Sequence, residues 1–412
     1  MKSLLKTTLL GIGILNAQES TKPTDSIQKL EPVFINSQVI FGSKYEAKNR
    51  TGSSYYLSPE ELEKFSYSDI NRVLKSVPGV HIYEEDGFGL RPNISLRGTS
   101  PDRSAKISIM EDGVLIAPAP YSAPAAYYFP SVARMQAVEI LKGSSQIQYG
   151  PFTTGGAINL VSTQIPNSFR GSINTSYGSF NTSQTHLKIG DSKTYIGYSL
   201  EYLNNNSDGF KNLANGDNTG FDKNDVVAKF KLQNKQNAKF NQSLELKFQY
   251  SDETSNETYL GLTTEDFESS PFDRYAASQK DKMTNDHLQF MVTHKINVSN
   301  FLQITSNAYH NDFSRNWYKL NDVVFGGDKV NISKILEAPQ NYPNYMDIIN
   351  GTSNSDANAF ILKANNRSYL SKGIQTKLDF HWNSAQVFHD LEIGLRYHYD
   401  DEDRFQWKDG YS

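Results

Sequence analysis

The chain has no cysteine among its 412 residues. Disulfide frameworks and cysteine-based metal sites are therefore excluded. A surplus of charge of one sign is also missing, because 41 Lys and Arg residues stand against 45 Asp and Glu residues, a net charge of −4. So nearly neutral a chain gives no reason to expect nucleic acid as a partner.

Long hydrophobic runs are missing as well. A helical membrane span needs about 20 consecutive apolar residues, whereas 37% of this chain is hydrophobic and the mean hydropathy is −0.57. Aromatic residues are abundant instead, with 24 Tyr and 23 Phe. A membrane β-barrel fits this composition, because only alternate residues of its strands face lipid. A soluble secreted β-protein rich in aromatics fits it equally well.

Motifs that carry catalysis are absent from the sequence. It contains no nucleophile elbow, no metal-ligand spacing and no phosphate-binding loop. His287 and His294 are seven residues apart in a strand pattern, which places them on opposite faces and makes them poor metal partners. We therefore expect neither an enzyme nor a resident cofactor.

The first 17 residues have the pattern of a secretory signal. Lys2 and Lys6 accompany a short apolar run that ends at Ala17, after which the chain becomes polar. We expect cleavage near Ala17 and export of the chain, with a buried N-terminal helix as the alternative.

Residues 18–50 are polar and interrupted by proline, and they predict a linker. They include one short β-prone run. This run consists of Pro32, Val33, Phe34, Ile35 and Asn36. Such a run can add as an extra strand to the edge of a partner's sheet. A first strand of the next domain and a plain linker are the alternatives.

Residues 51–166 predict a compact α+β domain. Ser58 and Pro59, followed by carboxylates, are a typical helix start. A second helix is expected near residues 68–76. Short strands are expected at residues 80–83, 94–97, 107–111, 137–142 and 157–162.

Residues 167–412 change to long alternating strands. Leu391, Ile393 and Leu395, for example, alternate with polar residues, and this period of two is typical of barrel strands. The polar stretches between strands are longest at 203–222, 252–285 and 320–358. We predict an antiparallel transmembrane β-barrel with long extracellular loops; a β-sandwich is the alternative, although such loops are uncommon in it.

The predicted barrel is incomplete. At about ten residues per strand plus loops, the chain supplies roughly ten to twelve strands. An open sheet edge cannot sit in lipid. We therefore expect this chain to be the N-terminal part of a larger barrel.

Three motifs in residues 51–166 resemble the plug domain of TonB-dependent outer-membrane receptors. They are NISLRG at 93–98, VEILKG at 138–143 with QYGP at 148–151, and GGAINLVS at 155–162. The resemblance implies a plug domain inside a barrel of about 22 strands. It also implies an outer-membrane location, energy coupling to the TonB protein with its inner-membrane complex, and a TonB box at residues 32–36.

The plug motifs supply candidate structural residues. Gly98, Gly155 and Gly156 permit tight turns and close backbone approach. Arg97 and Glu139 are candidates for polar contacts between plug and barrel, and pairing within the plug is the alternative.

Within this family, the ferric dicitrate receptors give the nearest resemblance. Residues 112–114 (DGV) and 117–124 (APAPYSAP) are similar to the apex loop of their plug, which makes Tyr121 a candidate ligand contact. Arg315 and Arg367 fall where those receptors have ligand-binding arginines. Guanidinium groups bind carboxylates in pairs of hydrogen bonds, as a metal citrate requires. Ordinary lumen or loop arginines are the alternative.

Two departures from those receptors bear on the ligand. Phe88 and Ala123 stand where the receptors have side chains that contact ferric citrate, and neither can donate a side-chain hydrogen bond. We expect active uptake of an iron chelate, with ferric citrate first and nickel citrate or heme as alternatives. A passive barrel or surface adhesin is the other class, and the predicted plug argues against it.

Overall fold

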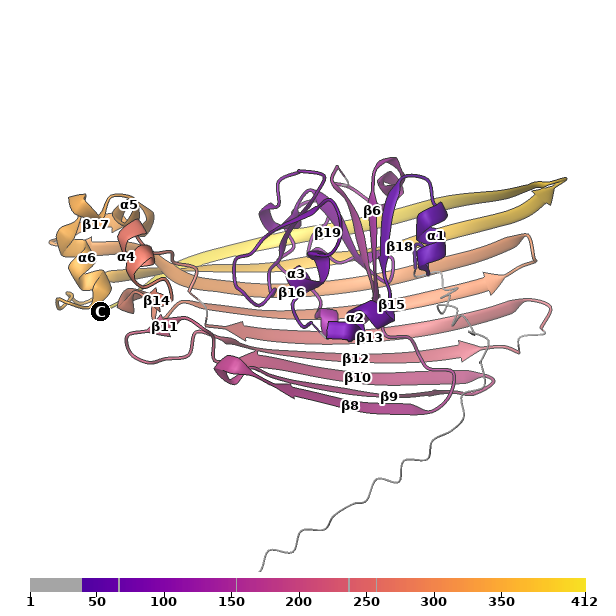
Figure 1. The fold of residues 1–412 in the computed structure, drawn as a ribbon, viewed down its shortest axis with the longest axis horizontal. Helices are drawn as coiled ribbons and strands as arrows, with labels where there is room; N and C mark the ends of the chain where they lie inside the picture. Colours follow the sequence, from indigo (N-terminus) through magenta and orange to yellow (C-terminus); the bar gives the residue numbers. More distant parts are fainter. Residues whose placement is uncertain (1–38, 66, 153, 236–237, 257) are drawn as a thin grey trace, which may run out of the picture. The chain divides into compact units, whose positions relative to one another are not determined.

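The computed structural model describes residues 39–412, apart from 66, 153, 236–237 and 257. The expected signal segment (residues 1–17) and the expected TonB box (residues 32–36) lie outside the described residues. An α+β domain is followed by one long antiparallel sheet (Figure 1). The fold class predicted from the sequence is confirmed.

The helices of the α+β domain are short and capped by side chains. They are α1 (Lys44–Asn49), α2 (Pro59–Phe65) and α3 (Ile70–Leu74). Ser58 starts α2 as expected: its backbone N–H donates to the Glu61 carboxylate at 2.9 Å, and the Glu61 N–H donates back to Ser58 Oγ at 3.4 Å. This reciprocal pair satisfies two N–H groups that a helix start otherwise leaves unpaired.

A five-stranded sheet forms the centre of the domain, in the order β1-β6-β7-β4-β5. Only β4 and β7 are parallel neighbours. The strands are β1 (Ser53–Leu57), β4 (Ile107–Glu111), β5 (Val114–Leu115), β6 (Met135–Lys142) and β7 (Gly156–Ser162). A separate hairpin pairs β2 (Val80–Tyr83) with β3 (Asn93–Leu96).

One apolar core holds these elements together. Leu74 of α3 packs in it with Ile140 of β6 and Ile158 of β7, all three fully buried. Burial of one such side chain stabilises the fold by roughly 1.5–3 kcal/mol. The core therefore fixes the sheet as a rigid base for the loops that leave it.

The long sheet has the strand order β19-β18-β16-β15-β13-β12-β10-β9-β8, with β17 beside β16. Among the described residues the two edge strands do not pair with each other, so the sheet is open. Its strands are β8 (Arg170–Tyr177), β9 (Ser183–Ser192), β10 (Ile196–Ser207), β12 (Phe221–Gln233), β13 (Asn241–Ser255), β15 (Lys282–Asn297), β16 (Leu302–Phe325), β17 (Asp328–Asn331), β18 (Phe360–Ser384) and β19 (Val387–Tyr411).

The two faces of the long sheet differ in chemistry. One face exposes large apolar side chains, as the alternation in the sequence predicts. These include Leu200, Phe230, Leu232, Phe248, Tyr250, Phe290, Ile374, Leu391, Ile393, Leu395 and Tyr397. The other face carries polar residues and is covered by the α+β domain, as the contacts of Lys247 with Glu111 and Asp112 show. An apolar outer face is the arrangement that a membrane barrel presents to lipid.

The long connections between strands gather at one end of the sheet (Figure 1). They contain β11 (Asn212–Leu213), β14 (Asp273–Arg274), α4 (Thr264–Ser269), α5 (Ile332–Glu337) and α6 (Pro343–Asn350). The third loop begins later than expected from residue 320, because β16 continues to Phe325 and pairs there with β17. In the part of the chain that is described, no helix is long and apolar enough to cross a membrane.

Candidate functional site

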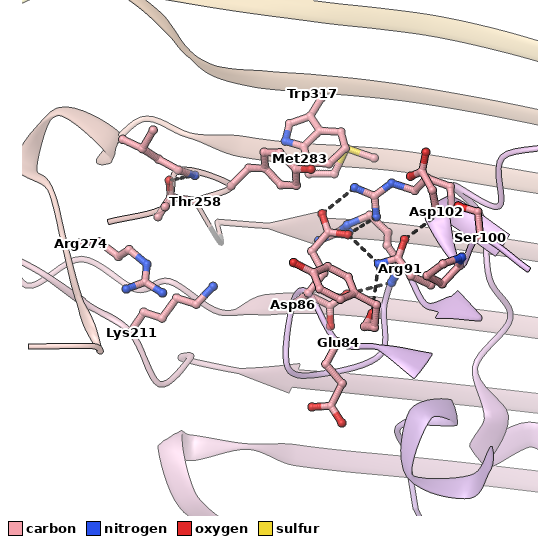
Figure 2. A pocket seen from close by; sticks show the side chains of 18 residues that line it. Glu84, Asp86, Arg91, Ser100, Asp102, Lys211, Thr258, Arg274, Met283 and Trp317 are labelled. Carbon is pink, nitrogen blue, oxygen red and sulfur yellow. Dashed lines mark hydrogen bonds and ion pairs between the residues drawn. The ribbon is translucent and has the colours of Figure 1, made fainter. Parts of the chain in front are cut away.

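A cavity of about 650 Å³ lies between the α+β domain and the long sheet, at the end where the long connections gather. Residues 83–86 and 100–103, with Arg91 and Asn93, form the wall on the side of the α+β domain. Figure 2 shows Lys211 and Arg274 on one side of it and Asp86 and Arg91 on the other. The opposite wall consists of Lys211, Thr258, Tyr259, Leu260, Gly261, Arg274, Met283 and Trp317.

The Asp86 carboxylate shapes the first wall. It accepts hydrogen bonds from the backbone N–H groups of Phe88 (2.7 Å), Gly89 (2.6 Å) and Arg91 (2.9 Å). Gly89 has a positive φ of 76°, and a Cβ there would lie 2.0 Å from the Asp69 carboxylate. A side chain would therefore not fit, and the loop turns tightly enough to aim Arg91 at the sheet.

Arg91 ties the cavity wall to the long sheet. Its guanidinium donates to the Glu253 carboxylate of β13 at 2.5 Å, and both side chains are buried. Burial would lower the pKa of Arg91, but the charges of Glu253 and Asp86 hold it above its ordinary value. Arg91 is thus permanently charged and neutralised, and its role is to hold the two walls together.

Arg103 is neutralised within its own wall. It forms a two-pronged ion pair with Glu85, one prong at 2.6 Å. Its guanidinium carbon also lies 5.5 Å from the ring centre of Tyr127 and 5.4 Å from that of Trp317. These aromatic contacts extend the cavity wall toward the interior of the sheet.

Lys211 and Arg274 form a positive pair on the opposite wall. Two-residue strands bring them together, because β11 and β14 pair in parallel with Leu213 opposite Arg274. Burial and the charge of Arg274 lower the pKa of Lys211 to about 8. Burial also lowers the pKa of Arg274. Two cations that repel each other beside a cavity favour an anion between them.

Most carboxylates of the first wall are already engaged. Glu85 pairs with Arg103, Asp86 accepts three backbone N–H groups, and Glu84 forms an ion pair with Lys75. The charges of Asp86 and Glu85 nevertheless act on Lys211 and partly offset the lowering of its pKa.

The loop after β5 reaches β19, an edge strand of the long sheet, and it contains two of the predicted ligand contacts. The Tyr121 N–H donates to the Asp400 carboxylate of β19 at 2.7 Å, and the Tyr121 ring lies 4.6 Å from that of His398. The Ala123 N–H donates to the Ala119 carbonyl at 2.8 Å, and Ala123 packs in a cluster with Phe313 and Tyr369. Neither residue lines the cavity.

Phe88 lies in the connection between β2 and β3 and belongs to an aromatic group. Its ring lies 4.9 Å from that of Phe221 and 5.7 Å from that of Phe210. The structure does not bring Phe88 together with Ala123, although the sequence groups both as ligand positions.

Arg315 and Arg367 are directly opposite each other on β16 and β18. Arg315 is buried, and its guanidinium carbon lies 3.9 Å above the ring centre of Tyr127. Arg367 donates to the Glu402 carboxylate at 2.8 Å. The structure therefore brings the two predicted arginines together, and Tyr127 separates Arg315 from the cavity wall at Arg103.

The hydrogen bonds of Arg97 and Glu139 do not reach the long sheet: Arg97 bonds within the α+β domain, and Glu139 bonds to this domain and to residues 40–42 before it. Arg97 donates to the Lys142 carbonyl at 3.3 Å. The buried Glu139 carboxylate accepts the backbone N–H groups of Ile40, Phe41 and Gly42 at 2.6, 2.7 and 2.9 Å, and the Asn159 amide at 2.8 Å. Burial raises the pKa of Glu139.

The motif glycines differ in what they require. Gly156 has a φ of 152°, and a Cβ there would lie 2.3 Å from the Leu141 carbonyl oxygen. A Cβ on Gly155 would lie 2.8 Å from the Thr99 hydroxyl, whereas Gly98 has open space around it and a φ of 74°. Gly155 and Gly156 are therefore required because other atoms approach the backbone closely. Gly98 is required because its backbone has a positive φ.

A buried ionic network, absent from the sequence analysis, joins the α+β domain to the sheet. Arg134 donates to Glu111 at 2.6 and 2.9 Å, and Lys247 of β13 donates to Glu111 at 2.5 Å and to Asp112 at 2.8 Å. Burial alone would raise the pKa of Glu111, but the charges of Arg134 and Lys247 lower it to about 2. Lys229 of β12 lies 3.9 Å from Asp112.

The sequence analysis also missed the cavity residues Arg91, Arg103, Lys211 and Arg274. The only signal available was that Lys211 and Arg274 fall in two of the expected long loops. Across the described ranges, no group of three or more His, Asp or Glu side chains could hold a metal ion.

Comparison with known proteins assigns the domain. Residues 46–157 match the family model of the TonB-dependent receptor plug domain. The fold over 90% of this chain is similar to half of the ferric citrate transporter FecA in its unliganded form, with a TM-score of 0.70 and 17% identity.

Other solved receptors give similar matches. The ferric yersiniabactin uptake receptor FyuA from Yersinia pestis matches 88% of this chain and 51% of its own, with a TM-score of 0.65 and 16% identity. The ferric-catecholate import receptor Fiu from E. coli K12 in its open form matches 86% and 50%, with a TM-score of 0.63 and 14% identity. At these identities the likeness is one of fold, and the chain spans about half the length of these structures.

Proposed function

Because the chain carries the plug domain of TonB-dependent receptors and has their fold over its described residues, we propose that it acts in active uptake of an anionic metal chelate across the outer membrane. The similar proteins are transport receptors rather than enzymes. Function must nevertheless be argued from the site, since one fold serves many ligands.

The observation that carries this proposal is the Lys211 and Arg274 pair beside the cavity. The volume of about 650 Å³ is within the range of small-molecule sites. In a membrane barrel the long connections are extracellular, so the cavity opens toward the medium. A multiply charged carboxylate chelate would place negative charge where burial and the charge of Arg274 lower the pKa of Lys211.

Ferric citrate is the chelate that we place first. Its free and metal-bound carboxylates match the guanidinium groups of Arg274 and of Arg315 and Arg367 behind the cavity wall. Phe88 and Ala123 offer no side-chain hydrogen bond and lie away from the cavity. Nickel citrate and heme, which also carry carboxylates, are therefore the ligands to test beside it.

Transport requires a partner that supplies energy, and we assign this role to the TonB protein with its inner-membrane complex. The proposed contact is the TonB box at residues 32–36, which we expect to pair with an edge of the partner's sheet. The described residues support this indirectly: Glu139 of the plug grips Ile40, Phe41 and Gly42, a few residues after that segment.

The apolar outer face of the long sheet supports an outer-membrane location. Its exposed Leu, Ile, Phe and Tyr side chains would be costly in water over so large a patch. Facing lipid, they are the part of the barrel that contacts acyl chains.

Tryptophan fluorescence of the full-length receptor in detergent tests the proposal, because Trp317 lines the cavity. We expect saturable binding of ferric citrate, nickel citrate or heme. The combined substitution of Lys211→Met and Arg274→Met should weaken it at least about tenfold. Lys193→Met, which removes an exposed cation from the opposite end of the sheet, should leave it unchanged.

No saturable response to any of the three chelates would overturn the anionic-chelate assignment. A receptor that lacks residues 32–36 should bind like the parent protein but fail to import the chelate into cells. Equal import by both proteins would overturn energy coupling through this segment.

A further inference from the structure

Three arginines stand in one row on the inner face of the long sheet. Arg315 of β16 is opposite Arg367 of β18, which is opposite Arg404 of β19. Glu402, two residues before Arg404, forms ion pairs with Arg367 at 2.8 Å and with Arg404 at 2.5 Å. Among the described residues this one carboxylate therefore pairs with two of the three guanidinium groups, and like charges directly opposite in a sheet repel.

Arg315 is the member of the row without an ion pair. It is 1% exposed, and none of its three guanidinium nitrogens has a hydrogen-bond partner among the described residues. Its principal electrostatic neighbours are the phenols of Tyr369 and Tyr127 and the positive charge of Arg367. A buried cation without an anion is rare in proteins and marks a position that a ligand completes.

The Tyr127 ring occupies the place of that anion. The guanidinium carbon of Arg315 lies 3.9 Å from the ring centre. A ring face attracts a cation but accepts none of its N–H groups in the plane of the guanidinium. The contact therefore covers Arg315 and leaves its hydrogen-bonding capacity unused.

Tyr127 is held less firmly than the residue that follows it. The Tyr128 ring stacks on His287 at 3.7 Å, is fully buried, and its hydroxyl bonds to Gln249. Tyr127 is half-buried and packs at the edge of the apolar cluster that includes Phe313 and Tyr369. Its ring also contacts Arg103, Arg315 and Trp317. Rotation of Tyr127 would open Arg315 toward the cavity while Tyr128 keeps the loop anchored.

We propose that Tyr127 is a displaceable cover of Arg315, so that an anionic chelate completes its site by replacing the Tyr127 ring. The inference rests on the proposed function, because it specifies how that site admits its ligand. A carboxylate that takes the place of the ring accepts two parallel N–H bonds from Arg315. A neutral ligand gains nothing from Arg315 and leaves the cover closed, so Tyr127 selects for negative charge.

Binding of ferric citrate to the full-length receptor tests the cover directly. Tyr127→Ala should bind ferric citrate about tenfold more tightly than the parent, because the fraction of receptor in the open state no longer limits affinity. Tyr127→Phe, which keeps the ring, should stay within about twofold of the parent. In an Arg315→Met background, Tyr127→Ala should change the affinity by less than about twofold.

Tyr259→Ala is the matched control. Tyr259 also lines the cavity, and its ring lies 6.0 Å from the Arg103 guanidinium carbon. It is not the ring above Arg315, so this substitution should not tighten binding. Weaker binding of ferric citrate by Tyr127→Ala in the parent background would make the ring a ligand contact and overturn the proposal.

The chemical accessibility of Arg315 tests the proposed cover independently of the proposed ligand. Phenylglyoxal, followed by peptide mass spectrometry, should modify Arg315 faster in Tyr127→Ala than in the parent or in Tyr259→Ala, without any ligand present. Equal rates would overturn the cover. Faster modification of Arg315 in a receptor that binds no chelate would support the cover and defeat the proposed function.

Discussion

Buried cations occur in two regions of this molecule, and their charges are satisfied in opposite ways. Where the plug sheet meets β13, Arg134 and Lys247 share the Glu111 and Asp112 carboxylates at hydrogen-bonding distance. Under the apex loop, Arg315 is equally buried but has no carboxylate and no hydrogen bond among the described residues.

The two kinds of buried cation have different roles: paired cations attach one domain to another, and an unpaired cation is suited to binding a ligand. A buried charge that is fully paired holds two parts of a protein in one arrangement, and removal of either partner is costly. A buried charge that lacks an ion-pair partner costs desolvation free energy, and we propose that at Arg315 a ligand supplies the missing partner. The first region therefore attaches the α+β domain to the sheet, and the second is the proposed position of a ligand.

The largest effect should come from removal of one cation of the paired region. Lys247→Met leaves Glu111 and Asp112 with less positive charge than they need in a dry site. We expect a loss of roughly 3–5 kcal/mol in the free energy of unfolding of the docked plug. Chemical denaturation, with hydrogen exchange of β4 and β7, measures it.

Lys329→Met is the control for this prediction, since Lys329 is exposed on β17 at the end of the same sheet. It should change the free energy of unfolding by no more than about 0.5 kcal/mol. Equal stability of the two variants would show that the ionic network does not attach the plug.

Glu139 is intermediate between the ion-paired Lys247 and the unpaired Arg315, because its buried carboxylate accepts hydrogen bonds but forms no ion pair among the described residues. Glu139→Gln turns an amide NH₂ toward backbone N–H groups that need an acceptor. We expect a loss of roughly 1–3 kcal/mol, seen as faster hydrogen exchange at residues 40–42. Unchanged exchange there would mean that other contacts hold this segment.

The affinity for an anionic chelate should depend on pH through Lys211. Its pKa is lowered to about 8, so the positive charge is lost as the pH rises through that value. A bound anion favours the charged form, and the affinity should therefore be constant below pH 7 and fall up to about tenfold between pH 8 and pH 9.5.

Isothermal titration calorimetry with ferric citrate across this pH range measures the dependence. The Lys211→Met variant should bind ferric citrate more weakly at pH 7, and its affinity should not fall between pH 8 and pH 9.5. Any dependence on pH that remains in this variant arises from the chelate itself. An identical decline in both proteins would exclude Lys211 as its source.

The smallest effect on stability should come from Arg315. Arg315→Met removes a buried charge that has no ion-pair partner among the described residues, so the free energy of unfolding should not fall by more than about 1 kcal/mol below that of the parent. The contrast with Lys247→Met is the sharpest form of the comparison. A loss as large as that of Lys247→Met would show that Arg315 is paired in the folded protein.

Local chemistry explains what the sequence could predict of the fold. The start of α2 depends on Ser58 and Glu61, three residues apart, and the strands β12 and β15 depend on a simple alternation that burial repeats. The crowded Gly156 was also foreseen, since only glycine fits against the Leu141 carbonyl.

The site was harder to predict because it depends on pairings without a sequence pattern. Strands of two residues, β11 and β14, bring Lys211 to Arg274. The positions of Arg315 and Arg367 came from resemblance, and their role as ligand contacts stays a prediction. That Tyr127 covers Arg315 follows only from the path of the apex loop over the sheet.

The grip of Glu139 on Ile40, Phe41 and Gly42 also has a mechanical meaning. A pull on the chain before residue 39 reaches these three hydrogen bonds first. The next element along the chain after α1 is β1, an edge strand joined to β6 alone in its sheet. Tension would therefore first separate β1 from β6. The ionic network at Lys247 would still hold the β4 side of the five-stranded sheet to β13 of the long sheet.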